Sequence, residues 1–200
     1  MSKKSTKLLD VIVIGAGASG MMAAITAARR GKSVAILERM NKPGKKILAT
    51  GNGKCNFTNN NMDTSRFHGN IQLIQSVLDR FSKEDTLSFF HEIGIWPKEK
   101  NGYYYPNSGQ AVSVVEAFNH ELNRLHVPVY LEQEVLDLFP DKYGFRIKTV
   151  QTSYTCRNVI VASGLLAASK LGSDGSMFSV IKELGHRFVP VLPALCGFYA

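Results

Sequence analysis

The residues best suited to chemistry in this sequence are three glycines with the spacing G-x-G-x-x-G, in the run GAGASG at positions 15–20. An apolar, β-branched run at 11–14 precedes them, an alanine-rich stretch follows, and Glu38 comes 18 positions after Gly20. A strand, a glycine turn, a helix and a following acidic residue together form the fingerprint of a dinucleotide-binding βαβ unit. The alternative is a structural glycine-rich turn that holds no nucleotide.

Each part of this motif has a physical role. Gly15 permits the tight turn, Gly17 lets the backbone approach a pyrophosphate, and Gly20 allows close packing of helix on strand. The helix N-terminus offers unpaired N–H groups and a positive dipole end to phosphates. We expect Glu38 to accept hydrogen bonds from an adenosine ribose and to repel the 2′-phosphate of NADP.

A cationic stretch follows the motif directly. Between positions 39 and 54 there are no carboxylates and five cations, namely Arg39, Lys42, Lys45, Lys46 and Lys54. A dinucleotide diphosphate would explain them, although solvated surface lysines are an alternative for any one of them. Gly51 and Gly53 remove side chains where a flat ring could approach the backbone, and an ordinary exposed turn is the alternative. A long loop at this point, in place of a second crossover helix, favours FAD over NAD.

The elements that must position these residues follow from periodicity and turn signals. Strands at 11–14 and 33–37 flank a helix at 21–30, which Gly31 ends as a C-terminal cap. The other expected elements are a long loop at 43–60, helices at 71–81 and 87–93 (the second capped by Ser82), a hairpin of 95–96 with 103–105 around Asn101-Gly102, a helix over 112–125, a β-meander of strands at 127–131, 135–139 and 145–149, a strand at 159–162 and a helix at 177–184. The pattern predicts an α/β, Rossmann-like FAD-binding domain with a parallel sheet and a β-meander.

Three stretches of the chain resemble one family. The run GKKILATGNGKCNFTN at 44–59 is similar to the signature of the BaiN/YhiN-like flavoproteins, which are FAD-dependent oxidoreductases of the glutathione-reductase-like superfamily. GYYYPNSGQAVSVV at 102–115 and NVIVASGLLAASKLGSDGSMFSVIKELGH at 158–186 also resemble it. The resemblance implies FAD as the cofactor, NADH or NADPH as a candidate electron donor, and a small organic substrate such as a steroid-like enone or a small amine.

The resemblance also implies which residues hold the cofactor, although it identifies no catalytic acid or base. The ADP site would be lined by Gly15, Gly17, Ala18, Ser19, Gly20, Glu38 and Arg39. The diphosphate, ribityl chain and flavin would be contacted by Lys46, Gly51, Asn52 and Gly53, with Asn56 nearby. Val135 would meet the adenine through its backbone, and Ala162, Ser163 and Gly164 would form a turn near the cofactor. Lys54, Tyr103 and Leu165 depart from the family pattern, which commonly has Arg, Arg and Gly there.

The family is about twice as long as this chain. We therefore expect residues 1–190 to form the FAD-binding domain, including a helical and hairpin segment at 61–126, and residues 191–200 to begin a missing substrate domain. The last 14 residues are mostly apolar, which water disfavours at a chain end, so we expect that more chain follows or that a partner covers them. The alternative is a non-catalytic fragment that at most binds the ADP part of FAD.

Composition excludes several other classes of protein. The chain has 200 residues, 44% of them hydrophobic, and a formal net charge of +8. This excess permits anion binding, but no RRM, KH or helix-turn-helix pattern accompanies it, so we expect no nucleic-acid partner. Asp10 and three glycines interrupt the apolar N-terminal run, which argues against a signal peptide or a membrane segment. No pattern indicates an oligomeric state.

The cysteines and histidines indicate neither a metal site nor a redox pair. Cys55, Cys156 and Cys196 include no C-x-x-C spacing, and the five histidines form no metal-binding motif. Sparse cysteines in an odd number are typical of the reducing cytoplasm. Cys55 is a candidate reactive thiol beside the glycine-rich stretch, but we expect it to be structural because no partner thiol lies near it in the sequence.

Overall fold

The computed structural model describes residues 8–192. The expected start of a substrate domain at 191–200 therefore lies almost entirely outside the described residues. The chain folds into two compact units. Of the described residues, the first unit contains 8–46 and 122–192, and the second contains 47–121.

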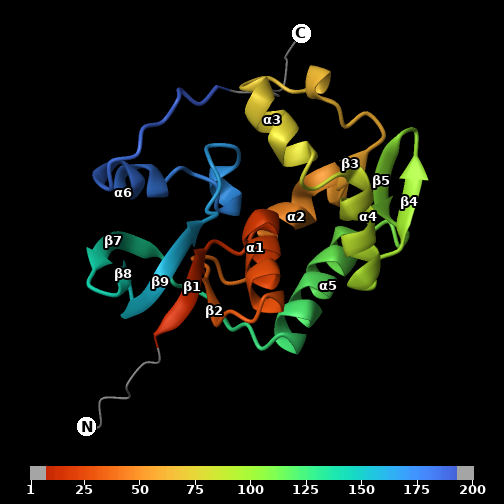
Figure 1. Cartoon of the computed structure of the whole chain (residues 1–200). Helices are drawn as coiled ribbons and strands as arrows, with labels where there is room; N and C mark the ends of the chain where they lie inside the picture. The colour runs from red at the N-terminus through yellow and green to blue at the C-terminus, as the bar shows by residue number, and fades with distance from the viewer. Residues whose placement is uncertain (1–7, 193–200) are drawn as a thin grey trace. The chain divides into compact units, whose positions relative to one another are not determined.

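The first unit is built on a six-stranded sheet with the order β6-β2-β1-β9-β8-β7. Its parallel part consists of β6 (Val129–Tyr130), β2 (Val34–Leu37), β1 (Leu9–Ile14) and β9 (Ser153–Val161). β1 lies centrally and pairs with β2 on one side and β9 on the other (Figure 1). All four residues of β2 and the last four of β1 are buried, as the β-branched runs predict for strands covered on both faces.

The helix α1 (Ala18–Arg29) connects β1 to β2 and covers the sheet with Met21, Ala24 and Ile25, all fully buried. It begins three residues before the predicted position, because the residues directly after Gly17 already form its first turn. It ends at Arg29, one residue before the predicted end. Arg30 is the C-terminal cap, and Gly31 has a φ of +76°, a left-handed conformation that favours glycine.

The antiparallel part of the sheet corrects the predicted meander. Its strands are β7 (Val135–Asp141), β8 (Gly144–Thr149) and β9. The predicted first strand at 127–131 is wrong as a member of the meander, because β6 pairs in parallel with β2. The nine-residue β9 serves both parts of the sheet: it pairs antiparallel with β8 and, from Cys156 onward, parallel with β1. Periodicity identifies a strand but not its neighbours, which is why the third meander strand was missed.

A short helix, α6 (Met177–Glu183), completes the core of the first unit. Its buried residues Met177 and Val180 pack with Leu138, Ile147 and Cys156 from the meander. The segment between β9 and α6 begins at the carboxyl end of β9, and it contains the 3-10 turn Ser169–Leu171. That end of the sheet is where open α/β folds hold ligands.

The second unit combines helices with a small antiparallel sheet of order β3-β5-β4. Its elements are α2 (Lys45–Ala49, which begins in the first unit), the 3-10 turn Thr50–Gly53, β3 (Thr58–Asn59), the 3-10 turn Thr64–Arg66, α3 (Ile71–Leu78), α4 (Lys83–Glu92), β4 (Pro97–Lys100), β5 (Tyr103–Pro106) and α5 (Ala111–Arg124, which ends in the first unit). Rings of Phe89, Phe90 and Phe118 pack together, with centroids 5.6–5.9 Å apart.

Two predictions for the second unit need correction. The stretch 43–60 is not one long loop, since it contains α2 and β3. The hairpin around Asn101-Gly102 is confirmed, but its first strand is β4 and not 95–96. A strand that begins with proline and continues with three charged residues lacks the apolar alternation that predicts strands, as edge strands often do. No helix among residues 8–192 has the length and apolarity needed to cross a membrane.

Candidate dinucleotide-binding site

A cavity of about 340 Å³ lies in the first unit, at the carboxyl ends of β1, β2 and β9. Its volume is within the range of small-molecule pockets. Backbone turns after three neighbouring parallel strands build it, and the segments from β6 to β7 and before α6 complete it. The lining residues are 14–19, 37–40, 42, 44–46, 133–135, 162–164, 171–173, 176 and 177.

The three motif glycines have different surroundings. Gly15 has a φ of +103°, and a Cβ there would lie 2.7 Å from the carbonyl oxygen of Ala162. A Cβ on Gly20 would collide with the carbonyl oxygen of Gly15, so this glycine permits the close packing of α1 on the turn. A Cβ on Gly17, in contrast, would meet no atom within 4 Å. Gly17 therefore leaves open space at the start of α1.

That open space lies beside hydrogen-bond donors. Gly17 is the N-terminal cap residue of α1 but has no side chain to accept the first N–H groups of the helix. These N–H groups have no partner within a helix, and the first turn of α1, which includes Ala18 and Ser19, carries no acidic residue. The arrangement suits an anion, which the helix dipole also favours.

Glu38 is held rigidly at the end of β2. Only 9% of it is exposed, and its two carboxylate oxygens accept hydrogen bonds from the backbone N–H groups of Ala16 (2.6 Å) and Met40 (2.8 Å). The carboxylate thereby connects the glycine turn after β1 to the chain after β2. Each oxygen keeps a second lone pair that can accept a hydroxyl group, so the expected ribose contact is compatible with the geometry.

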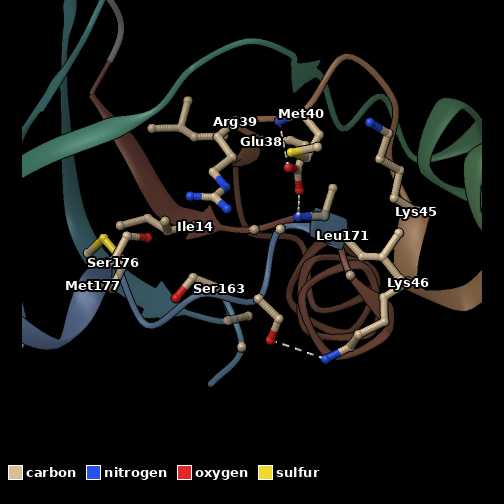
Figure 2. A pocket seen from close by; sticks show the side chains of 18 of the residues that line it. Ile14, Glu38, Arg39, Met40, Lys45, Lys46, Ser163, Leu171, Ser176 and Met177 are labelled. Atoms are coloured by element: carbon tan, nitrogen blue, oxygen red, sulfur yellow. Dashed lines mark hydrogen bonds between the residues drawn. The ribbon is translucent and has the colours of Figure 1, made fainter. Parts of the chain in front are cut away.

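Cations surround the cavity. Arg39, Lys42, Lys45 and Lys46 all line it. Figure 2 shows Glu38 and Arg39 on one side of the pocket, with Lys46 and Ser163 on the other. The Lys46 ammonium donates a hydrogen bond to Oγ of Ser173 at 3.3 Å. The positive charge around the cavity is opposite in sign to that of a diphosphate.

Arg39 has a partner that sequence reasoning missed. Its Nη1 donates to Oδ2 of Asp174 at 2.7 Å, across 135 positions of sequence. Burial by itself would raise the pKa of Asp174, but hydrogen bonds from Arg39 and Ser176 outweigh it and lower the pKa to about 2. No local pattern could have revealed this pair, because only the fold brings the loop before α6 to the end of β2.

Of the predicted residues of the first unit, Gly20 does not line the cavity, whereas the four not yet described do. Val135 does so at the start of β7, next to a bulge that shifts the register of β7 against β8. Ala162, Ser163 and Gly164 form the turn after β9, and the N–H of Ala162 donates to the carbonyl of Ile14 at 2.8 Å. A Cβ on Gly164 would collide with Oγ of Ser173, which explains a glycine at this position.

Four predicted cofactor residues lie in the second unit, and their contact with a cofactor stays a prediction. Gly51, Asn52 and Gly53 have φ values of +55°, +54° and +79°. A Cβ on Gly51 would lie 2.7 Å from the N atom of Asn56, whereas one on Gly53 would meet no atom within 4 Å. The Asn56 amide donates to the carbonyls of Thr58 and Tyr104, both at 3.1 Å. Gly51 and Asn56 thus have structural roles within their own unit.

The two described cysteines are buried and free. Burial raises the pKa of Cys55, although a hydrogen bond with Thr50 opposes this effect. Burial also raises the pKa of Cys156 to about 11. Thiols that stay protonated are poor nucleophiles, so the structure supports a structural role for Cys55. Cys196 lies outside the described residues. Within residues 8–192, no group of three or more His, Cys, Asp or Glu side chains could hold a metal ion.

The comparisons with known proteins agree with this geometry. Residues 9–193 match the family model described as "HI0933-like protein Rossmann domain". The chain is 44% identical to the 3-dehydro-bile acid delta(4,6)-reductase of Clostridium scindens, over 92% of this chain and 46% of that protein. It is 32% identical to the ribosomal RNA dihydrouridine synthase of Haemophilus influenzae, over 94% of this chain and 48% of that protein.

Solved structures support the same fold. The 3-ketosteroid-Δ4-(5α)-dehydrogenase of Rhodococcus jostii superimposes with a TM-score of 0.62 at 16% identity, over 83% of this chain and 48% of the other. The chain spans about half the length of the curated relatives it matches. The predicted Rossmann-like fold and the predicted resemblance to the BaiN/YhiN-like flavoproteins are confirmed. By its sequence match, its fold and its glycine-rich pocket, the chain belongs to the HI0933-like Rossmann-domain family of FAD-binding proteins.

Proposed function

We propose that this chain binds the ADP part of FAD in the cavity at the start of α1, as part of an FAD-dependent oxidoreductase. The observation that carries the proposal is the space beside Gly17, where a Cβ would meet no atom within 4 Å and where the first N–H groups of α1 begin. Together with the carboxylate of Glu38 and the surrounding cations, this space supports the binding of a diphosphate and a neighbouring ribose.

When bound, FAD supplies the hydride or electron transfer, whereas the protein binds and orients it. The N–H groups at the start of α1 and the ammonium groups of Lys45 and Lys46 would hold the diphosphate. Glu38 would accept the ribose hydroxyls, and the backbone at Val135 would meet the adenine. Gly51, Asn52 and Gly53, with Asn56, would contact the cofactor farther along, and residues 1–190 would constitute its binding domain.

The relatives narrow the reaction that we propose for the whole protein. One is a delta(4,6)-reductase of a 3-dehydro-bile acid, and the other forms dihydrouridine. Both names describe the addition of two hydrogens to a carbon–carbon double bond that is conjugated to a carbonyl group. We therefore propose reduction of such a bond, with NADH or NADPH as the electron donor.

A small enone is the first candidate substrate. We propose the cytoplasm as the location of the protein. The bile-acid reductase shares 44% identity with this chain, whereas the ribosomal RNA enzyme shares 32%. Uridine in RNA is the second candidate, because the same class of double bond occurs in it and the chain carries a net charge of +8. The prediction of a small-molecule partner and no nucleic-acid partner agrees with the enone and not with uridine in RNA.

The test uses the full-length product of the gene that encodes this chain. The purified protein is expected to be yellow and, under anaerobic conditions with NADH or NADPH, to reduce a 3-oxo-Δ4,6 steroid faster than uridine in an RNA transcript. A protein that is colourless and gains no flavin absorbance when FAD is added would refute the proposal. Faster reduction of the RNA would select the second candidate. Flavin binding without turnover of either substrate would exclude both substrate candidates.

A further inference from the structure

We propose that Asp174 determines specificity at the dinucleotide site, by withholding the Arg39 guanidinium from phosphorylated ribose. The inference rests on the proposed function, since it concerns which dinucleotide the same pocket accepts. Asp174 does not itself line the cavity, and neither the glycine motif nor the family resemblance gives it a role, so it would act through Arg39. The ligand class that it would exclude is the adenosine dinucleotides with a 2′-phosphate.

The position of Arg39 suggests that its guanidinium could influence which dinucleotides the pocket accepts. It follows Glu38, the residue placed to contact the ribose, and it lines the same cavity. In dinucleotide-binding folds, an arginine near this position accommodates the 2′-phosphate of NADP, whereas the acidic residue selects the free hydroxyl. This chain carries both residue types side by side. Without a further residue, Glu38 would repel a 2′-phosphate while the adjacent Arg39 guanidinium attracted it.

Asp174 removes that conflict. Its Oδ2 accepts from Nη1 of Arg39 at 2.7 Å, and its side chain is 32% exposed against 23% for Arg39. The Nε of Arg39 is buried and has no hydrogen-bond partner among the described residues. The guanidinium is thus held at one end by a carboxylate and is closed to solvent at Nε. A 2′-phosphate that paired with Nη1 of Arg39 would therefore have to displace the Asp174 carboxylate.

The backbone keeps Asp174 in this place. Its Oδ1 accepts from the N–H of Ser176 at 3.1 Å. The preceding residue, Ser173, is 3% exposed, donates from Oγ to the carbonyl of Leu165 at 3.1 Å, and pairs with Ala168 in an isolated bridge. Lys46 donates to the same Oγ. The short segment before α6 is therefore fastened on both sides of the pocket, so Asp174 is positioned before any ligand arrives.

The test compares ADP-ribose with ADP-ribose 2′-phosphate, two probes that differ only in the phosphate, by calorimetric titration of the chain. The wild-type protein is expected to prefer ADP-ribose. Asp174→Asn should reduce this preference about tenfold, the value of one charge-assisted hydrogen bond. Asp174→Ser, which can still accept from Ser176, should do the same. The double variant Arg39→Gln with Asp174→Asn should restore the preference, because the guanidinium responsible is gone.

The readout is a ratio of two affinities, so a loss of folded protein affects both probes equally and cancels. Asp141→Asn is the matched control, since Asp141 pairs with Arg146 at 3.1 Å away from the pocket, and its preference should equal that of the wild type. An unchanged preference in both Asp174 variants, with ADP-ribose still bound, would overturn the inference and leave the proposed function standing. If the wild-type protein binds neither probe, the proposed function fails and the inference fails with it.

Discussion

Gly17 and Gly20 are three residues apart, yet an added side chain would meet different surroundings at each. Gly17 has a φ of −79° and a ψ of −177°, an extended conformation open to any residue, and free space where its Cβ would be. Serine is a favoured N-terminal cap, so Gly17→Ser should leave the free energy of unfolding unchanged or slightly higher. Its hydroxyl would compete for the first helical N–H groups, so the affinity for ADP should fall about tenfold or more.

Gly20→Ser is the contrasting variant for this prediction. Its Cβ would collide with the carbonyl oxygen of Gly15, and α1 could not keep its place. A loss of about 3 kcal/mol or more in the free energy of unfolding is expected, at the upper end for overpacked sites. Denaturant unfolding and ADP titration separate the two variants. Equal ADP affinity in Gly17→Ser and the wild-type protein would show that the space beside Gly17 is not the diphosphate site.

The Arg39–Asp174 ion pair predicts a pH dependence of stability. The pKa of Asp174 in the folded protein is lowered from 3.8 to about 2. A lowered folded-state pKa stabilises the fold above the unfolded value, and that contribution disappears as the pH falls through the folded value. The difference in free energy of unfolding between the wild-type protein and Asp174→Asn should therefore be constant above about pH 5 and shrink from pH 3.8 towards pH 2. Urea titrations across this range measure it, and a constant difference would contradict the assigned ion pair.

Residues that act through local sequence were predictable, whereas distant pairs were not. Gly15, Gly17 and Gly20 lie between the end of β1 and the first turn of α1, as the motif predicts, because the strand, turn and helix are consecutive in the chain. The position of Glu38 after β2 was predictable because the helix that connects β1 to β2 has the usual length for such a unit. Asp174 gave no signal, since its partner is 135 positions away.

At the scale of elements, α4 offers a direct test of local stabilisation. Ser82 and Asp85 form a capping box: the Ser82 N–H donates to the Asp85 carboxylate at 2.7 Å, and the Asp85 N–H donates to the Ser82 hydroxyl at 3.1 Å. Ser82→Ala should destabilise α4 by about 1 kcal/mol. Hydrogen exchange of the α4 amides measures this change. Ser88→Ala, the same substitution at an exposed interior position of α4, should protect these amides equally or slightly better, and equal exchange in both variants would contradict the cap.

The elements also show why strands were harder to predict than helices. Ser82 and the apolar spacing after it located α4, because a helix is specified by residues three and four positions apart. The long β9 was predicted only at 159–162, its apolar end. Its polar first half is a strand because β8 pairs with it, and a partner of that kind does not appear in the periodicity of one segment. β6 was assigned to the wrong neighbour for the same reason.

At the scale of the whole chain, the fold class was predictable but the division into two units was not. A βαβ unit with a glycine turn and an acidic residue is a strong constraint on topology. The boundaries between the units fall within α2 and within α5, so no linker composition marks them. The net charge of +8 was compatible with several classes of partner and could not distinguish between them. The positions of the charged residues are more informative than the net charge.

The most direct test of the account is a crystal structure of the chain with bound ADP. We expect the diphosphate within hydrogen-bond distance of the backbone N–H groups at the start of α1, beside Gly17, and the ribose hydroxyls against the carboxylate of Glu38. A diphosphate bound elsewhere on the protein, or a cavity that stays empty at saturating ADP, would contradict the central claim.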